Sequence, residues 1–146
     1  MAGKALGISL EDARQVIRAG QEKALQMGLR MNIAVVDAGA NLVAFERQDG
    51  AWLGSIDIAI NKAFTARAFD IETKALAGNS QSGEQFFGIH NSNNGRVMIF
   101  AGGVPLRAGD EVVGAVGVSG GVGKEDQAVA EAAAQAFTHA TSRRVA

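Results

Sequence analysis

Hydrophobic residues recur at helical spacing in three stretches of the chain. The first stretch begins after Ser9-Leu-Glu-Asp12, which resembles a helix capping box, and continues to Gly28. The second begins at Ser55, and its apolar positions are Ile56, Ala59, Ile60, Ala63 and Phe64. The third covers about Lys124 to Thr138. The pattern predicts three amphipathic helices, with a short continuation of the second over Glu72–Leu76 that ends at Gly78.

Short apolar runs typical of strands separate these helices. Met31–Val36 and Leu42–Arg47 flank Asp37-Ala-Gly-Ala-Asn41, whose small and polar residues favour a turn, so these segments predict a hairpin. A further strand is predicted over Val97–Ala101, after a polar stretch from Gly78 to Gly95 that has the composition of a long loop. Loops of this length are more often functional than accidental.

A glycine-rich segment follows and predicts a second hairpin. Gly102 and Gly103 permit backbone conformations that other residues rarely adopt, and Pro105, the only proline, marks the start of a strand edge or turn. Ala108-Gly-Asp110 has turn chemistry. The run that follows, Glu111–Ser119, is almost wholly small or β-branched and predicts a buried strand.

Two glycines within that last strand indicate a close approach. Gly114 and Gly117 are spaced as though another backbone, or a partner subunit, packs against the strand. The order of the predicted elements, with short hairpin connections, favours an antiparallel sheet over a parallel one. We therefore expect an α+β fold with a five-stranded antiparallel sheet flanked by helices.

Length, charge and cysteine content narrow the class of protein. The 146 residues are enough for one domain, residues 1–146, with a core that needs neither disulfides nor a structural metal. A formal net charge of −1 gives no electrostatic reason to expect nucleic acid or an acidic membrane as partner. The absence of cysteine excludes thiolate zinc sites and cysteine nucleophiles. With no signal-like start and no membrane-length apolar run, we expect a cytoplasmic protein.

Four ordered motifs, spread over nearly the whole chain, resemble the GlcG/HbpS-like family, which includes the C-terminal domain of PduO-type proteins. The motifs are Ala34–Arg47, Ala59–Ala66, Gly102–Leu106 and Gly114–Gly120. The resemblance implies a profilin-like α+β fold, dimers that assemble into rings or octamers, and genes often placed beside catabolic genes. For some members it also implies binding of haem or corrinoid-related ligands. The first helix, where a haem-ligating histidine would be sought, contains none.

The chain has two histidines, and neither has a metal-ligand companion at two to four residues' spacing. His139 is placed in the last turn of the final helix, where a cation is stabilised by the helix dipole. His90 lies in the long loop, close to two phenylalanines and several amides. It is a candidate haem ligand or general base, although a solvated loop histidine is the simpler interpretation.

The middle helix carries the main candidates for binding an anion. Asn61 and Thr65 share one side of this helix, beside Lys62. One interpretation is a polar patch that holds a carboxylate or propionate, with Lys62 as the point charge. The other is an ordinary solvated helix face. Glu46 and Arg47, at the end of a strand, form either the other wall of such a site or a surface ion pair.

Phosphate binding at the start of the last helix has weak support. The segment from Gly117 to Glu125 leads from a strand through glycines into a helix, but it lacks both the first glycine of a P-loop and the hydroxyl residue that follows its lysine. Free N–H groups at a helix start are a generic anion site. Glu125 and Asp126 already place negative charge there.

The leading hypothesis is an oligomeric protein that binds a small organic ligand, with haem or another tetrapyrrole as the candidate that the resemblance implies. Its role would be sensing, sequestration or support of catabolism. Charged groups for a carboxylate and glycines that allow close approach make up the expected lining. These residues are Arg47, Asn61, Lys62, Thr65, His90, Gly102, Gly103 and Pro105.

Two alternatives remain open. One is an enzyme that acts on a small carboxylated catabolite, with His90 or Glu46 as the proton carrier and Lys62 or Arg47 holding the acid. The other is a purely structural oligomer that binds no ligand.

Overall fold

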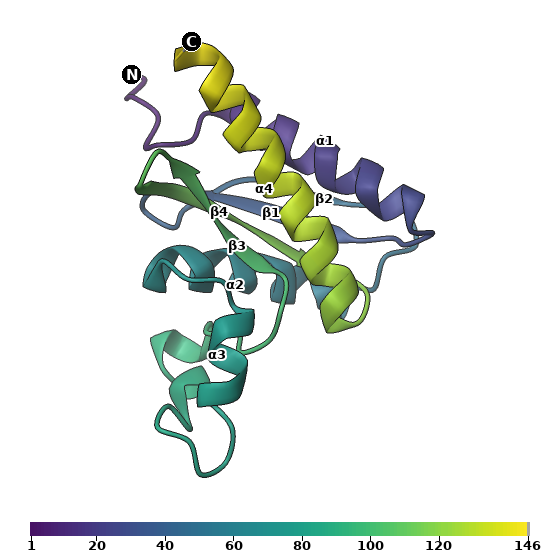
Figure 1. Cartoon of the computed structure of the whole chain (residues 1–146), viewed down its shortest axis with the longest axis vertical. Coiled ribbons are helices and arrows are strands. Elements are labelled where there is room, and N and C mark those ends of the chain that lie inside the picture. Colours follow the sequence, from purple (N-terminus) through teal and green to yellow (C-terminus); the bar gives the residue numbers. More distant parts are fainter. Residues whose placement is uncertain (146) are drawn as a thin grey trace.

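A four-stranded antiparallel sheet in the order β2-β1-β4-β3 forms the centre of the computed structural model (Figure 1). The structure describes the backbone of residues 1–145 and the side chains of residues 1–138. The strands are β1 (Asn32–Asp37), β2 (Leu42–Arg47), β3 (Gly103–Ala108) and β4 (Glu111–Ser119). Both hairpins predicted from the sequence, β1 with β2 and β3 with β4, are confirmed.

Helices cover both faces of this sheet. They are α1 (Leu10–Gln26), α2 (Gly54–Phe69), α3 (Lys74–Asn79) and α4 (Gly123–Val145), with short 3-10 helices at Ile89–Asn91 and Asn93–Gly95. Figure 1 shows α1 and α4 side by side on one face and α2 on the other, with α3 and the segment after it beyond α2. The predicted α+β class is therefore confirmed. No helix among residues 1–145 combines the length and hydrophobicity needed to cross a membrane.

The first helix begins as its sequence predicts. The backbone N–H of Asp12 donates to Ser9 Oγ at 3.0 Å, and the Asp12 carboxylate accepts from the Ser9 N–H at 3.2 Å. This reciprocal capping box satisfies two backbone donors that a helix start leaves unpaired. At the other end the helix caps at Met27, and Gly28 follows with a φ of +72°.

The two faces of β1 pack against different helices because successive side chains of a strand point in opposite directions. Ile33 and Val35 join the larger apolar cluster, which α1 and α4 cover. Ala34 and Val36 join a smaller cluster made mostly of alanines, including Ala59 of α2. Small side chains on this face let α2 lie close to the sheet.

Neighbouring atoms of the same chain leave no room for a side chain at Gly114 or Gly117. A Cβ at Gly117 would collide with the carbonyl oxygen of Ala59 in α2, and one at Gly114 would meet the Ile8 side chain. The close approach inferred from their spacing is therefore present. It is an intramolecular contact, so these glycines are explained without a partner subunit.

The prediction of a fifth strand over Val97–Ala101 was wrong. This segment forms no strand within residues 1–145, and the sheet has four strands. The backbone N–H of Met98 instead donates to Thr65 Oγ1 in α2 at 2.9 Å. A side chain of the helix thus takes the hydrogen bond that a neighbouring strand would have supplied.

Candidate functional site

Lys62 is completely buried, at 0% exposure, on the side of α2 that faces the sheet. Residues three and four apart in a helix share a face, and Lys62 falls between the buried Ala59, Ala63 and Ala66. A lysine is almost never fully buried unless its charge is paired. The interpretation of this helix side as solvated is therefore wrong for Lys62.

Three groups surround the Lys62 ammonium. Its Nζ donates to Asp126 Oδ2 at 2.9 Å and to the carbonyl oxygen of Val118 at 2.9 Å. The Phe100 ring centroid lies 4.9 Å from the same nitrogen, within the range of a cation–π interaction. Phe100 is itself 44% exposed, so this aromatic ring stands between the buried charge and solvent.

Asp126 is held at the start of α4 by the backbone before it. Its Oδ1 accepts from the N–H of Gly121 at 2.8 Å, while the neighbouring Glu125 Oε1 accepts from the N–H of Val122 at 2.9 Å. The chain's own carboxylates therefore occupy these amides. The geometry gives no support to phosphate binding at this helix start.

Burial shifts both partners of the ion pair. Loss of water around the ammonium lowers the pKa of Lys62, although the Asp126 charge partly opposes this. Burial likewise raises the pKa of Asp126, with the Lys62 charge and hydrogen bond opposing the shift. Desolvation disfavours the charged form of each group, so both are displaced towards neutrality. Such displaced pairs occur both in structural networks and in functional sites.

Gly102 and Gly103 lie directly against Lys62, as the sequence predicts for residues that allow close approach. A Cβ at Gly102, where φ is +122°, would lie 2.7 Å from Lys62 Nζ. A Cβ at Gly103 would lie 2.6 Å from the Lys62 carbonyl oxygen, and the Gly103 N–H donates to Thr73 Oγ1 at 2.8 Å. The structure thus brings these three predicted residues together.

Asn61 and Thr65 are buried close by and are engaged in hydrogen bonds within the chain. Thr65 Oγ1 donates to the Asn61 carbonyl oxygen at 2.8 Å and accepts from Met98. Asn61 Nδ2 donates to Asp57 Oδ2 at 3.0 Å. The Asn61 side chain therefore stabilises α2, and Thr65 joins α2 to the segment that leads to Phe100.

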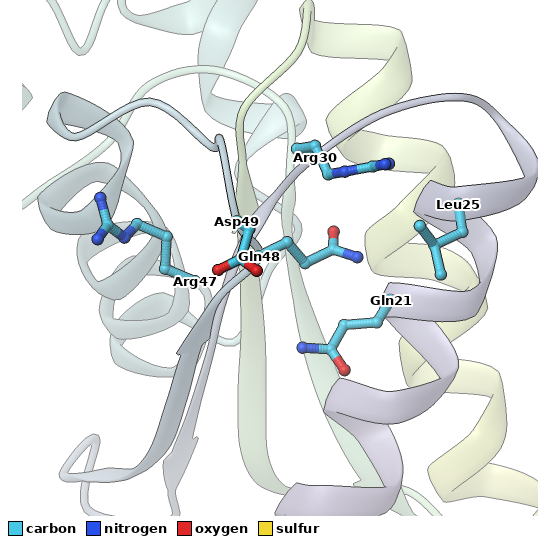
Figure 2. A pocket seen from close by; sticks show the side chains of 6 residues that line it. All are labelled: Gln21, Leu25, Arg30, Arg47, Gln48 and Asp49. Carbon is cyan, nitrogen blue, oxygen red and sulfur yellow. The ribbon is translucent and has the colours of Figure 1, made fainter.

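Arg47 lies away from Lys62, Gly102 and Gly103. It ends β2, one edge strand of the sheet, whereas Gly103 begins β3, the opposite edge strand. Arg47 lines an open pocket of about 440 Å³, together with Gln21, Leu25, Arg30, Gln48 and Asp49. Figure 2 shows its side chain directed away from Gln21 and Leu25. The structure therefore separates Arg47 from Lys62.

Pro105 and His90 occupy two further positions. Pro105 is a half-buried residue of β3, opposite Ala115. His90 belongs to the 3-10 helix Ile89–Asn91 and is half-buried, and its Nδ1 has no hydrogen-bond partner among the described residues. The His139 side chain lies outside the described residues. In the part of the chain that is described, no three acidic or histidine side chains gather in a way that could hold a metal ion.

Sequence reasoning missed the two groups that complete the environment of Lys62. Asp126 was interpreted only as negative charge at a helix start, and Phe100 only as part of a strand. The signal was the alanine face of α2, because a lysine between Ala59, Ala63 and Ala66 has to be buried and therefore needs an anion. Which anion it meets depends on how α4 packs, and the local sequence does not contain that information.

Comparison with known proteins places the fold and these motifs in a family. The model of the haem degrading protein HbpS-like family matches residues 8–135. The structure of Klebsiella pneumoniae protein ORFY is 34% identical, with a TM-score of 0.88 and 94% of each chain covered. The structure of a PduOC:haem complex is 32% identical, with a TM-score of 0.85, covering 88% of this chain and 94% of that one.

A curated relative supports the same placement. A 15.0 kDa protein of Citrobacter freundii, encoded between dhaT and dhaS, is 37% identical over 131 residues, which are 90% of this chain and 92% of the relative. The family model and these relatives all extend over most of the chain. This chain belongs to the HbpS-like family.

Proposed function

We propose that this protein binds haem, or another tetrapyrrole that carries carboxylates, as an assembly of several copies. The family to which this chain belongs is that of haem degrading proteins like HbpS, and the related PduOC structure is a complex with haem. The proposed role is sensing, sequestering or supporting catabolism. Haem, when bound, would supply the redox and oxygen chemistry of its iron.

The observation that carries the proposal is the unpartnered Nδ1 of His90. A buried polar atom without a hydrogen bond costs about 1–3 kcal/mol, and such atoms are rare in folded proteins. No described residue ties this ring nitrogen to the protein. His90 therefore has no structural hydrogen bond through Nδ1 among the described residues, which leaves its imidazole available as an iron ligand.

The surroundings of His90 suit the face of a macrocycle. Phe86 and Phe87 are 44% and 64% exposed, and they lie four and three residues before His90. Ligand pockets are lined mainly by apolar and aromatic side chains with a few polar groups. The exposed rings would cover the haem, and His90 would bind the iron.

The ligand set predicts the spectrum. The sequence contains neither cysteine nor tyrosine, and His90 and His139 are the only histidines. A single histidine ligand would leave a ferric haem high-spin, whereas strong ligation by two histidines would make it low-spin. We therefore expect weak or single-histidine binding.

Haemin titration followed at the Soret band tests the site, with His139→Ala as the matched control for His90→Ala. The wild type and His139→Ala should bind haemin with a high-spin spectrum, and His90→Ala should lose most of this binding. A sharp low-spin spectrum that is unchanged in His90→Ala would refute the proposed ligand.

Exposed apolar side chains support the assembly. Trp52, Leu53, Phe87 and Val122 are each more than half exposed. Aromatic residues are enriched in the buried parts of protein interfaces. The family resemblance leads us to expect dimers that form an octamer. Light scattering should give a multiple of the 15.1 kDa chain mass, and a constant monomer mass at micromolar concentration would exclude the assembly.

One observation favours the enzyme alternative. Lys62, a candidate for holding the acid, is buried against Asp126, and the pKa values of both groups are displaced towards neutrality. Of the two proton carriers considered, His90 lies in the 3-10 helix Ile89–Asn91, and Glu46 is exposed in β2 and accepts from Gln21 Nε2 at 3.3 Å. Colourless protein after haemin treatment, together with turnover of a small carboxylated compound that is lost in a folded His90→Ala or Glu46→Gln variant, would favour the enzyme over the haem-binding protein.

A further inference from the structure

We propose a second site, in which Arg67 and Arg96 bind the carboxylate or phosphate group of a small molecule. The site is a pocket of about 370 Å³ between the β1–β2 turn and the C-terminal half of α2, and its lining includes Ala38, Gly39, Ala40, Phe64, Arg67 and Arg96. Neither Lys62 nor His90 lines it. The proposal is therefore independent of haem binding.

Arg96 is oriented by two contacts. Its guanidinium carbon lies 3.9 Å from the centroid of the Phe64 ring, and its Nε donates to the Asn93 carbonyl oxygen at 3.0 Å. A guanidinium carries five donors in a rigid fork. The contact with the Phe64 ring uses the face of the guanidinium, and the hydrogen bond to Asn93 uses Nε–H. The N–H groups of the two terminal nitrogens of Arg96 can therefore bind an oxyanion through two hydrogen bonds.

Arg67 supplies a second fixed cation. Its Nε donates to the Ala38 carbonyl oxygen at 2.7 Å, and its Nη1 pairs with Asp70 Oδ1 at 2.6 Å. No acidic residue is among those that line the pocket. Asp70 pairs with Arg67, and the Asp37 carboxylate accepts from the backbone N–H of the pocket residue Gly39 at 2.9 Å, so two carboxylates lie near the two guanidinium groups. Arg96 forms no ion pair among the described residues, so its charge is available to an anionic ligand.

The backbone around the pocket is unusual. Four described residues other than glycine have a positive φ, namely Ala40, Asp70, Asn93 and Asn94. Ala40 and Asn93 line the pocket, Asp70 holds Arg67, and Asn94 follows Asn93. Such conformations cost free energy and cluster at ligand sites. In this pocket, the fixed backbone holds the segments next to Arg67 and Arg96 in place before a ligand binds, which lowers the entropic cost of binding.

NMR titration with inorganic phosphate and with malonate, at constant ionic strength against chloride, tests the site. We expect chemical-shift changes at the Gly39 and Ala40 amides and at the Nε–H groups of both arginines. Arg96→Met should weaken binding by about ten- to a hundredfold, the effect of losing a charge-assisted contact. Arg107→Met, which removes an exposed arginine of β3, should leave binding unchanged.

The two ligands identify the group that is recognised. Tighter binding of malonate assigns the site to carboxylates, and tighter binding of phosphate assigns it to phosphates. If neither ligand shifts these signals more than chloride does, the proposal is overturned. It is also overturned if a folded Arg96→Met variant, checked by its amide spectrum, binds as the wild type does. Arg67→Lys, which keeps the charge but loses the fork, should weaken binding as well.

Discussion

Lys62 and Asp126 lie 64 positions apart in the chain and form a 2.9 Å ion pair in which both side chains are almost completely buried. The pair joins α2, on one face of the sheet, to the first turn of α4, on the other face, at the point where β4 ends. Desolvation of two charges can exceed their mutual attraction. A pair of this kind is therefore most costly when only one partner is removed.

Asp126→Asn should destabilise the protein strongly. The substitution leaves the Lys62 ammonium buried without its counter-charge, and breaking a buried pair in this way typically costs about 3–5 kcal/mol. Urea unfolding measures the loss. The double variant Lys62→Met/Asp126→Asn should lose less than the sum of the two single variants, because it leaves no charge unpaired.

An exposed ion pair provides the control for this experiment. Lys74 pairs with Glu72 at 3.3 Å on the surface, so Lys74→Met should leave the free energy of unfolding almost unchanged. If Asp126→Asn cost as little as Lys74→Met, the pair would not be buried in solution as it is in this structure.

The stability of the wild type relative to the double variant should depend on pH. Burial lowers the pKa of Lys62 below its ordinary 10.5, so the unfolded chain holds this proton more tightly than the folded one. The relative free energy of unfolding should therefore rise as the pH increases from neutral towards 10.5. Burial raises the pKa of Asp126 above 3.8, so the relative stability should also rise as the pH falls towards 3.8.

Urea unfolding of both proteins across this pH range checks the signs, because all other titrating groups are shared. We expect the difference in the free energy of unfolding to be smallest near neutrality. A difference that is largest near neutrality would show that attraction between the charges outweighs their desolvation.

Phe100→Ala should expose Lys62 to reagents. The ring lies 4.9 Å from Nζ and separates it from solvent, and the contact contributes about 0.5–2 kcal/mol. Amine acetylation followed by peptide mass spectrometry measures the exposure. Lys62 should be protected in the wild type and labelled faster in the variant, while the exposed Lys124 labels equally in both. Equal protection of Lys62 in the two proteins would mean that Phe100 does not cover it.

Gly117→Ala should destabilise the protein by about 1–3 kcal/mol or more, because the added methyl group meets the Ala59 carbonyl oxygen of α2. Thermal unfolding measures the change. Gly78→Ala in α3 is the matched control, since nothing lies within 4 Å of its added Cβ. Alanine there should be neutral or stabilising by up to about 1 kcal/mol. Equal effects at the two positions would contradict the close packing of α2 on the sheet.

Local patterns were sufficient to predict most of the elements. The capping box at Ser9, the two hairpins and the glycine approach at Gly117 depend on residues that are near one another or on steric limits of a single residue. The strand prediction for Val97–Ala101 failed because this apolar run resembles a strand, yet the backbone N–H of Met98 donates to the side chain of Thr65. Such a choice between partners is a tertiary effect.

The candidate site was predictable only in part, for the same reason. Lys62, Gly102 and Gly103 were identified as neighbours, and they are neighbours. The partner of Lys62 and the separate position of Arg47 depend on the order of the strands and on the docking of α4. Neither is encoded in the spacing of residues along one element.

A crystal structure of the haemin-loaded protein is the most direct test of the central claim. We predict that the iron is bound by His90 and that the macrocycle lies against Phe86 or Phe87. Haem bound with its iron away from His90, or no haem bound at saturating haemin, would contradict it.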